Sequence, residues 1–211
     1  MKDLDSIFYR IETIVLLLLC SPLFVIFFLA VKLTSKGPFL FKQKRLGKDK
    51  KPFTMYKIRT MVNNAEQLKK KYYHLNQIHG GPVFKIKNDP RYTKIGKIIS
   101  HTGLDELPQL INVIKGEMSL VGPRPLPLEE AEKVPKKYER RFSVLPGITS
   151  PWVIKGSHVL SFRQWMELDL DYIKKQNFCY DMKICIQTAI LILKLMISNI
   201  LSPISNLKFK T

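Results

Sequence analysis

The strongest constraint on this chain is an uncharged, apolar stretch that runs from Thr13 to Val31. As an α-helix this stretch would extend about 28 Å, which is close to the thickness of the hydrocarbon layer of a bilayer. It is longer than the apolar part of a typical signal peptide, and no cleavage site of small residues follows Ala30. We therefore predict a membrane segment that is retained in the protein.

Ser21 and Pro22 interrupt the middle of this stretch. Pro22 has no N–H to donate to the Leu18 carbonyl and its ring crowds the preceding turn, while Ser21 can hydrogen-bond back to a carbonyl one turn earlier. A break here would leave two arms of about 13 Å each, short enough to enter the bilayer and return. The residues alone leave both a spanning and a re-entrant segment open, because many spanning helices tolerate a proline.

Basic residues after the segment predict that the following chain lies on the cytoplasmic side of the membrane. These residues are Lys32, Lys36, Lys42, Lys44, Arg45, Lys48, Lys50 and Lys51. The whole chain carries 35 Lys+Arg against 17 Asp+Glu, a net charge of +18, so an anionic partner is expected. Nucleic acid, anionic lipid and a phosphorylated substrate all fit that charge, but no nucleic-acid-reading motif is present, and we predict that nucleic acid is not a partner.

Metal-binding spacings of cysteine and histidine are absent from the sequence. The three cysteines form no CxxC pair, and the four histidines are scattered without an HExxH pattern. We predict neither a structural zinc site nor a disulfide framework. Hydrophobic residues make up 45% of the chain, which is enough to build a folded core.

The remaining pattern predicts an α-rich α/β domain. Short strands are expected at residues 39–41 and 52–59, and helices at 62–75 and 129–141, with an acidic helix around Trp165 and an interfacial or core helix over 184–201. Thr102 is a candidate N-cap for a helix that contains Leu107 and Leu110. Asp105 and Glu106 then lie in its first turn, where acidic residues commonly do no more than complement the helix dipole. Arg124 stands between two prolines that restrict the backbone, which suits a phosphate contact but also a stiff linker.

Several ordered motifs resemble the bacterial sugar transferases, and in particular the small monotopic polyprenyl-phosphate phosphoglycosyl transferases. The motifs are the break at Ser21 and Pro22 and the segments 41–47 (FKQKRLG), 56–61 (YKIRTM), 84–85 (FK), 88–91 (NDPR), 104–110 (LDELPQL), 116–125 (GEMSLVGPRP) and 146–149 (PGIT). They cover nearly the whole chain in the family's order, and such a set is far more specific than any one motif.

The resemblance implies a re-entrant helix-break-helix over residues 1–36 and a catalytic domain over residues 37–211 with interfacial amphipathic helices, on the cytoplasmic face of the bacterial inner membrane. The implied reaction moves a sugar 1-phosphate from a UDP-sugar to polyprenyl phosphate and releases UMP, as the first membrane step of capsule, O-antigen, exopolysaccharide or glycoprotein synthesis. Downstream glycosyltransferases are possible partners. Asp105 would be the nucleophile that forms a covalent phosphosugar intermediate, and Glu106 would assist it and share a Mg²⁺ ion with it.

Phosphate contacts are expected first from Arg124, and then from Lys57, Arg59, Lys85 and Arg91, each of which could instead anchor the domain to anionic headgroups.

The chain departs from the family pattern at two places where an arginine is usual. Ser100 precedes the expected nucleophile by five residues, and Ser157 lies in the stretch after the PGIT motif, where Lys155 or Arg163 could substitute. A catalytically impaired relative that acts as a membrane scaffold is therefore an alternative. A basic, membrane-anchored nucleic-acid binder is the other alternative, on charge alone. The sequence does not identify the sugar, the pathway or the oligomeric state.

Overall fold

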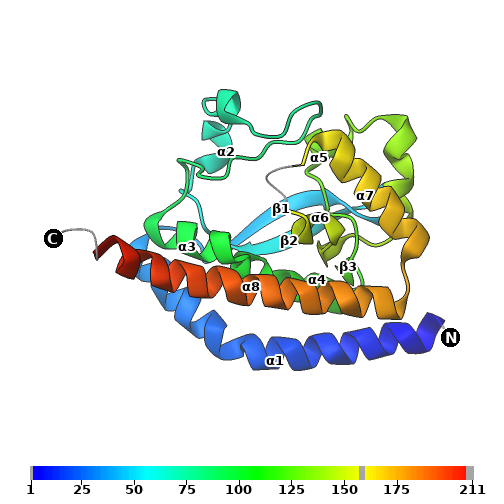
Figure 1. Ribbon diagram of the computed structural model, residues 1–211, viewed down its shortest axis with the longest axis horizontal. Coiled ribbons are helices and arrows are strands. Elements are labelled where there is room, and N and C mark those ends of the chain that lie inside the picture. The colour runs from blue at the N-terminus through cyan, green and yellow to red at the C-terminus, as the bar shows by residue number, and fades with distance from the viewer. Residues whose placement is uncertain (1, 157–159, 208–211) are drawn as a thin grey trace.

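The computed structural model describes the backbone of residues 2–156 and 160–207, and the side chains of residues 13–156 and 160–198. Ser157 lies outside these residues. The structure is helix-rich, with two small sheets, as the α-rich α/β prediction requires (Figure 1).

The N-terminal helix α1 spans Lys2–Thr34 and contains Pro22. Its segment Thr13–Thr34 is long and apolar enough to cross a membrane, and most of its side chains are exposed, Leu19 at 72%. The secondary structure is continuous through Pro22, and Figure 1 shows α1 changing direction partway along its length. The helix is thus continuous at Ser21 and Pro22, where the break was predicted. An exposed apolar surface of this size is expected where lipid or another apolar phase covers it.

An antiparallel hairpin follows α1. Strand β1 (Leu40–Leu46) pairs with β2 (Pro52–Ile58), Leu40 opposite Ile58, with the 3₁₀ turn η1 (Lys48–Lys50) between them. Strand β2 agrees with the strand predicted over 52–59, whereas β1 begins within the strand predicted over 39–41 and continues through Leu46. Phe53 and Met55 on alternate positions of β2 are buried, as the period of two in a strand requires.

The segment predicted as a helix over 62–75 forms only the short helix α2 (Ala65–Leu68) and the 3₁₀ turn η2 (Tyr73–Leu75). Neither contains a buried residue. A polar stretch without an apolar face gains little from packing, and a longer helix is not favoured there. The helix prediction was therefore wrong for most of this segment.

The motif that holds Asp105 lies between two helices. Helix α3 (Lys94–Thr102) ends at Gly103, which takes the left-handed conformation with φ 76°. The 3₁₀ helix η3 (Leu104–Gln109) and helix α4 (Leu110–Ile114) follow. The predicted N-cap at Thr102 was wrong, because the Thr102 hydroxyl donates back to the Ile99 carbonyl at 2.8 Å and closes α3 instead.

The second half of the chain packs around a short parallel pair, β3 (Ser119–Val121) and β4 (Gly147–Thr149). Its helical elements are α5 (Leu128–Ala131), η4 (Lys136–Ser143), α6 (Pro151–Ile154), α7 (Phe162–Lys175) and α8 (Phe178–Leu207). The helix predicted over 129–141 is divided into α5 and η4, because Pro135 cannot continue a helix from α5. The acidic helix around Trp165 is confirmed as α7.

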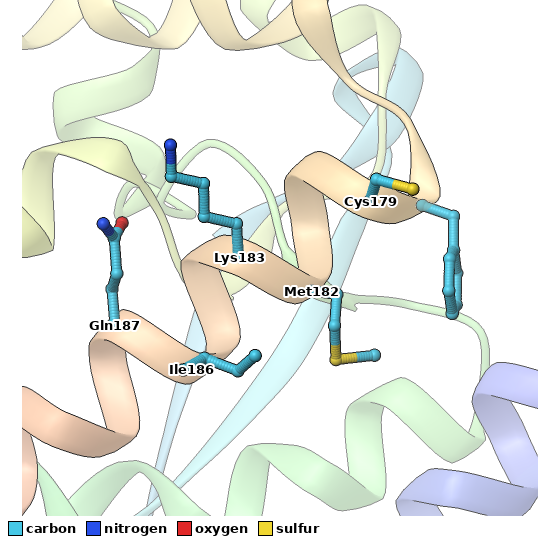
Figure 2. A pocket seen from close by; sticks show the side chains of 6 residues that line it. Cys179, Met182, Lys183, Ile186 and Gln187 are labelled. Carbon is cyan, nitrogen blue, oxygen red and sulfur yellow. The ribbon is translucent and has the colours of Figure 1, made fainter.

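Helix α8 runs along one side of the domain (Figure 1) and buries Ile184 while Ile186, Ile190 and Ile197 remain exposed. A hollow near its start is lined by α8 alone, where Figure 2 shows Cys179, Met182 and Ile186 beside Lys183 and Gln187. None of the predicted catalytic or phosphate-binding residues lines this hollow, so the candidate site lies elsewhere.

The end of α1 belongs to the core of the domain. Val31 is 2% exposed and clusters with Ile58 at the end of β2 and Ile99 in α3. A larger cluster, which includes Trp152, Trp165 and Phe162, joins α6 to α7. These contacts place the end of β2, α3 and the turn after it in fixed positions around the candidate site.

Candidate active site

Asp105 and Glu106 lie in η3, directly beside the end of β2. The left-handed turn at Gly103 redirects the chain after α3, so that η3 packs against β2. Asp105 is 6% exposed. Lys57, the penultimate residue of β2, extends its Nζ to within 2.6 Å of Glu106 Oε1 and 3.7 Å of Asp105 Oδ2. Three residues that the sequence analysis selected therefore form one buried cluster.

Arg124 completes the cluster from the loop after β3. Its Nη2 lies 2.9 Å from Glu106 Oε1, the same oxygen that accepts from Lys57. One carboxylate oxygen thus receives two cationic donors, and charge-assisted bonds of this kind are the strong ones. Among the residues whose side chains the structure describes, the ion pair of Asp105 is the longer one with Lys57 alone. The two neighbouring acids differ sharply in how well their charge is compensated.

Lys85 and Trp152 form the opposite wall of this cluster. The indole ring of Trp152 has Lys85 Nζ 4.8 Å from its centroid and the Arg124 guanidinium carbon 5.6 Å away. An aromatic face attracts cations at such distances. Trp152 was not among the predicted site residues. The only signal for it in the sequence was its place shortly after the PGIT motif.

Burial and neighbouring charges shift the pKa values of the acids in opposite directions. Burial raises the pKa of Asp105 to about 6, against the opposing effect of Lys57 and with a smaller contribution from Glu106. Burial would also raise the pKa of Glu106, but Arg124 and Lys57 together outweigh it and hold that pKa well below its usual range. Glu106 is therefore a fixed counter-charge, whereas Asp105 is a carboxylate with little stabilisation.

The pKa of Lys85 is lowered to about 7, mainly by burial and then by the neighbouring Arg124. At neutral pH and below, the three cations Lys57, Lys85 and Arg124 outnumber the two carboxylates. Such a surplus of positive charge in a partly desolvated site favours a phosphate group beside Asp105.

The structure does not bring Arg59 and Arg91 into this cluster. Arg59 donates to the backbone carbonyls of Lys36 and Pro38, each at 2.6 Å, and so fastens the connection between α1 and β1. Arg91 forms a buried two-point pair with Asp89 and donates to the Ala65 carbonyl at 3.0 Å. These contacts of Arg59 and Arg91 are those of residues that hold the fold together.

The two departures from the family pattern lie differently. The Ser100 hydroxyl donates to the Tyr92 hydroxyl at 2.9 Å, and Ser157 is outside the described residues. Of the predicted substitutes, Lys155 is exposed, and Arg163 pairs with Glu167 on the exposed side of α7.

The carboxylates of Asp105 and Glu106 are suitable ligands for Mg²⁺. Among the residues that the structure describes, no group of three His, Cys, Asp or Glu side chains gathers in the manner of an all-protein metal site. Mg²⁺ is commonly held by one or two carboxylates, with waters and substrate phosphates completing its shell. Asp105 fits that mode because its pKa shows a buried carboxylate short of positive charge.

Known proteins are similar to this chain over most of its length. The sequence model of a family described as bacterial sugar transferase matches residues 4–195. The chain is 44% identical over 158 residues to the galactosyl transferase CpsE of Streptococcus agalactiae, covering 74% of this chain and 35% of that protein. It is 36% identical to the undecaprenyl-phosphate galactose phosphotransferase of Salmonella typhimurium, over 92% of this chain and 41% of the other.

A shorter relative matches along most of its length. The uncharacterized sugar transferase EpsL of Bacillus subtilis is 36% identical over 86% of this chain and 83% of its own. The chain thus spans less than half of the first two relatives and most of the third.

Proposed function

This chain belongs to the bacterial sugar transferase family, and we propose that it transfers a sugar 1-phosphate from a UDP-sugar to polyprenyl phosphate and releases UMP. The observation that carries this proposal is the unequal pair: Asp105 is buried and poorly compensated, whereas Glu106 is held by Lys57 and Arg124. Two relatives support the substrate class by name, the Salmonella protein above and a UDP-glucose:undecaprenyl-phosphate glucose-1-phosphate transferase of Klebsiella pneumoniae.

In the proposed first step an oxygen of Asp105 attacks the phosphorus that bears the sugar. The bond from this phosphorus to the oxygen that bridges it to the uridylyl phosphate breaks, UMP leaves with the electron pair, and an acyl phosphate links Asp105 to the sugar phosphate. In the second step a phosphate oxygen of the lipid attacks the same phosphorus and frees the carboxylate. A carboxylate with an elevated pKa is less stabilised by its surroundings in the ionised form. It is therefore a better nucleophile once it is ionised.

The cations around Asp105 have separate tasks in this proposal. Arg124 and Lys85 share the Trp152 face and would bind the diphosphate, because their cationic groups lie beside the Asp105–Glu106 pair. Lys57 contacts both acids and would reduce the repulsion between their two negative charges. Preorganised donors of this kind stabilise the negative charge that develops as the phosphoryl group transfers.

We further propose that Asp105 and Glu106 hold Mg²⁺ together with the substrate. When bound, the ion would neutralise charge on the diphosphate. The protein residues already hold the two acids in place without it, since Glu106 is fixed by Lys57 and Arg124.

For the membrane, we propose that residues 1–36 form a re-entrant segment bent at Ser21 and Pro22 and that residues 37–211 form the catalytic domain on the cytoplasmic face. The exposed apolar surface of α1 and the apolar exposed residues of α8 support contact with lipid. A cysteine-reactive label applied from the periplasm to intact cells tests the topology. Labelling of a cysteine placed in an N-terminal tag would contradict the re-entrant arrangement.

The test of the reaction is UMP release by the purified protein in lipid or detergent. It would be incubated with undecaprenyl phosphate, Mg²⁺ and UDP-galactose, UDP-glucose or UDP-N-acetylhexosamines, beside an Asp105→Asn control. Release with one sugar that is lost without Mg²⁺ and in the Asp105→Asn protein is the expected result. Folded protein that releases no UMP with any of these donors would refute the proposal and favour a scaffold role.

A further inference from the structure

The loop that carries Arg124 is held in an unusual way. Its three prolines have no N–H, so the loop can be fixed to its surroundings mainly through its carbonyl groups. Four successive carbonyls, those of residues 123–126, each accept a hydrogen bond, and the donors come from three distant parts of the chain. The donors are Gly147 N to Pro123 O at 3.0 Å, Arg141 Nη2 to Arg124 O at 2.8 Å, Arg45 Nη1 to Pro125 O at 2.9 Å, and Leu46 N to Leu126 O at 3.2 Å.

Of the two arginine side chains in this set, Arg141 is buried and Arg45 is partly buried. Arg141 is 3% exposed and binds Asp169 in α7 through Nε at 3.1 Å and Nη2 at 2.9 Å. Asp169 is fully buried, and burial raises its pKa to about 6 although Arg141 opposes this. On the other side of the loop, burial lowers the pKa of Arg45 to about 10, with Arg124 as a further cause.

Stability alone is a poor explanation for these groups. Desolvating an arginine and an aspartate is costly, and well-packed apolar residues often stabilise a core as well as a buried ion pair does. What the guanidinium groups add is direction, because a planar fork can bind a carboxylate and a carbonyl at the same time. Arg141 uses its fork in this way, with Asp169 on one side and the peptide of Arg124 on the other.

We propose that Arg45 and Arg141 are positioning residues, which hold the carbonyls of Arg124 and of the next residue, Pro125, so that the Arg124 guanidinium meets Glu106 and the donor's diphosphate. This inference rests on the proposed function, because Arg124 must contact substrate for its position to matter. The side chain of Arg124 is fixed by Glu106 at 2.9 Å and by the Trp152 face, whereas its backbone is fixed by Arg141. A displacement of about 1 Å at a group of this kind can lower a rate by on the order of 100-fold.

The test is a double-mutant cycle on UMP release measured in single turnovers. Arg141→Lys keeps the charge opposite Asp169 but loses the fork that reaches the carbonyl of Arg124. We expect it to lower kcat/KM for the UDP-sugar by roughly 10- to 100-fold in the wild-type background. In an Arg124→Lys background it should lower kcat/KM less than about twofold, because the group that it positions is already gone.

Arg91 provides a matched control. It makes the same set of contacts, two bonds to a buried aspartate and one to a carbonyl, but that carbonyl belongs to Ala65, away from the Arg124 loop. Whatever factor Arg91→Lys costs through stability should be the same with and without Arg124→Lys. Thermal unfolding of each variant records that common cost.

The positioning role and the proposed function predict different outcomes. If wild-type protein releases UMP and Arg141→Lys costs the same factor in both backgrounds, or costs nothing, the positioning role is wrong and the proposed function stands. If wild-type protein releases no UMP with any donor, the proposed function is wrong and the positioning role falls with it.

Discussion

Asp105→Asn should make this protein more stable at neutral pH while it abolishes UMP release. Asp105 is buried, and its pKa is raised from 3.8 to about 6, so the folded state favours the neutral form of this side chain. The sign follows from linkage. A group with a raised folded-state pKa contributes stability below its unfolded pKa, near 4, and this contribution is lost as the pH rises through about 6. Asparagine has nearly the shape of the acid and is neutral at every pH.

The magnitude follows from the size of the pKa change. About two pKa units at 1.36 kcal/mol each correspond to roughly 3 kcal/mol at pH 7.5 and above. The substitution also removes the 3.7 Å contact with Lys57, which the pKa already includes. For a chain of this length 1 kcal/mol moves the unfolding midpoint by about 2–4 °C. We therefore expect Asp105→Asn to unfold roughly 5–10 °C above the wild type.

The assay is thermal unfolding in a fixed detergent from pH 4 to pH 8, with a chelator present so that no divalent ion neutralises the acids. The difference between Asp105→Asn and the wild type should be small at pH 4, grow between about pH 4 and pH 6, and then level off.

Glu106→Gln is the control, since it applies the same chemical change to the adjacent residue. Glu106 is the partner of both Lys57 and Arg124, and its pKa is lowered, so removing its charge leaves two cations uncompensated. Loss of one partner of a buried pair costs on the order of 3 kcal/mol. Glu106→Gln should therefore be less stable than the wild type throughout pH 5–8. Two variants that shift the midpoint in the same direction, or an Asp105→Asn difference that does not change with pH, would refute the unequal roles of the two acids.

Three further predictions concern the walls of the site and its support. Because the pKa of Lys85 is about 7, kcat/KM for UMP release should decline as the pH rises above 7, and Lys85→Arg should move that decline to higher pH, as a pH–rate profile would show. Trp152→Leu removes the shared face of Lys85 and Arg124 and should lower kcat/KM roughly tenfold with donor titration as the measurement; an unchanged value would contradict the cation–π arrangement. In Gly96→Ala the new Cβ would lie 1.9 Å from the Thr60 carbonyl oxygen, so the variant should unfold well below the wild type in a thermal scan, whereas Gly80→Ala, with open space but positive φ, should lose about 1 kcal/mol.

The sequence predicted the parts of the site that rest on local pattern. The strand that carries Lys57 was predicted from the alternation and the acidic pair Asp105 and Glu106 from the family motif, and the structure brings both together with Arg124. It did not predict the roles of Arg45, Arg141 or Asp169. Their contacts join residues 80, 17 and 28 positions apart, and nothing in a linear pattern indicates which carbonyl or carboxylate a distant arginine will meet.

The helix predictions failed at three places, each for its own physical reason. The polar stretch over 62–75 had the composition of a helix but no face to bury, and the stretch over 129–141 contained a proline that divides it. Thr102 had the right spacing for a cap, but its hydroxyl found a nearer acceptor within α3. Missing packing therefore explains the first failure, whereas a proline and a hydrogen bond within α3 explain the other two.

The connection between α1 and the β1–β2 hairpin determines the position of Asp105 relative to the membrane helix. Val31 is part of the core, and Arg59 donates to the carbonyls of Lys36 and Pro38 after α1. The helix α1 is therefore rigidly attached to the domain. With α1 in the bilayer as proposed, the depth of that helix determines the height of Asp105 above the lipid headgroups, and this height stays constant. In that arrangement the domain cannot bend down toward a lipid phosphate, so the proposed reaction requires the polyprenyl carrier to rise to Asp105. Bilayers of different thickness should then present that carrier with different ease.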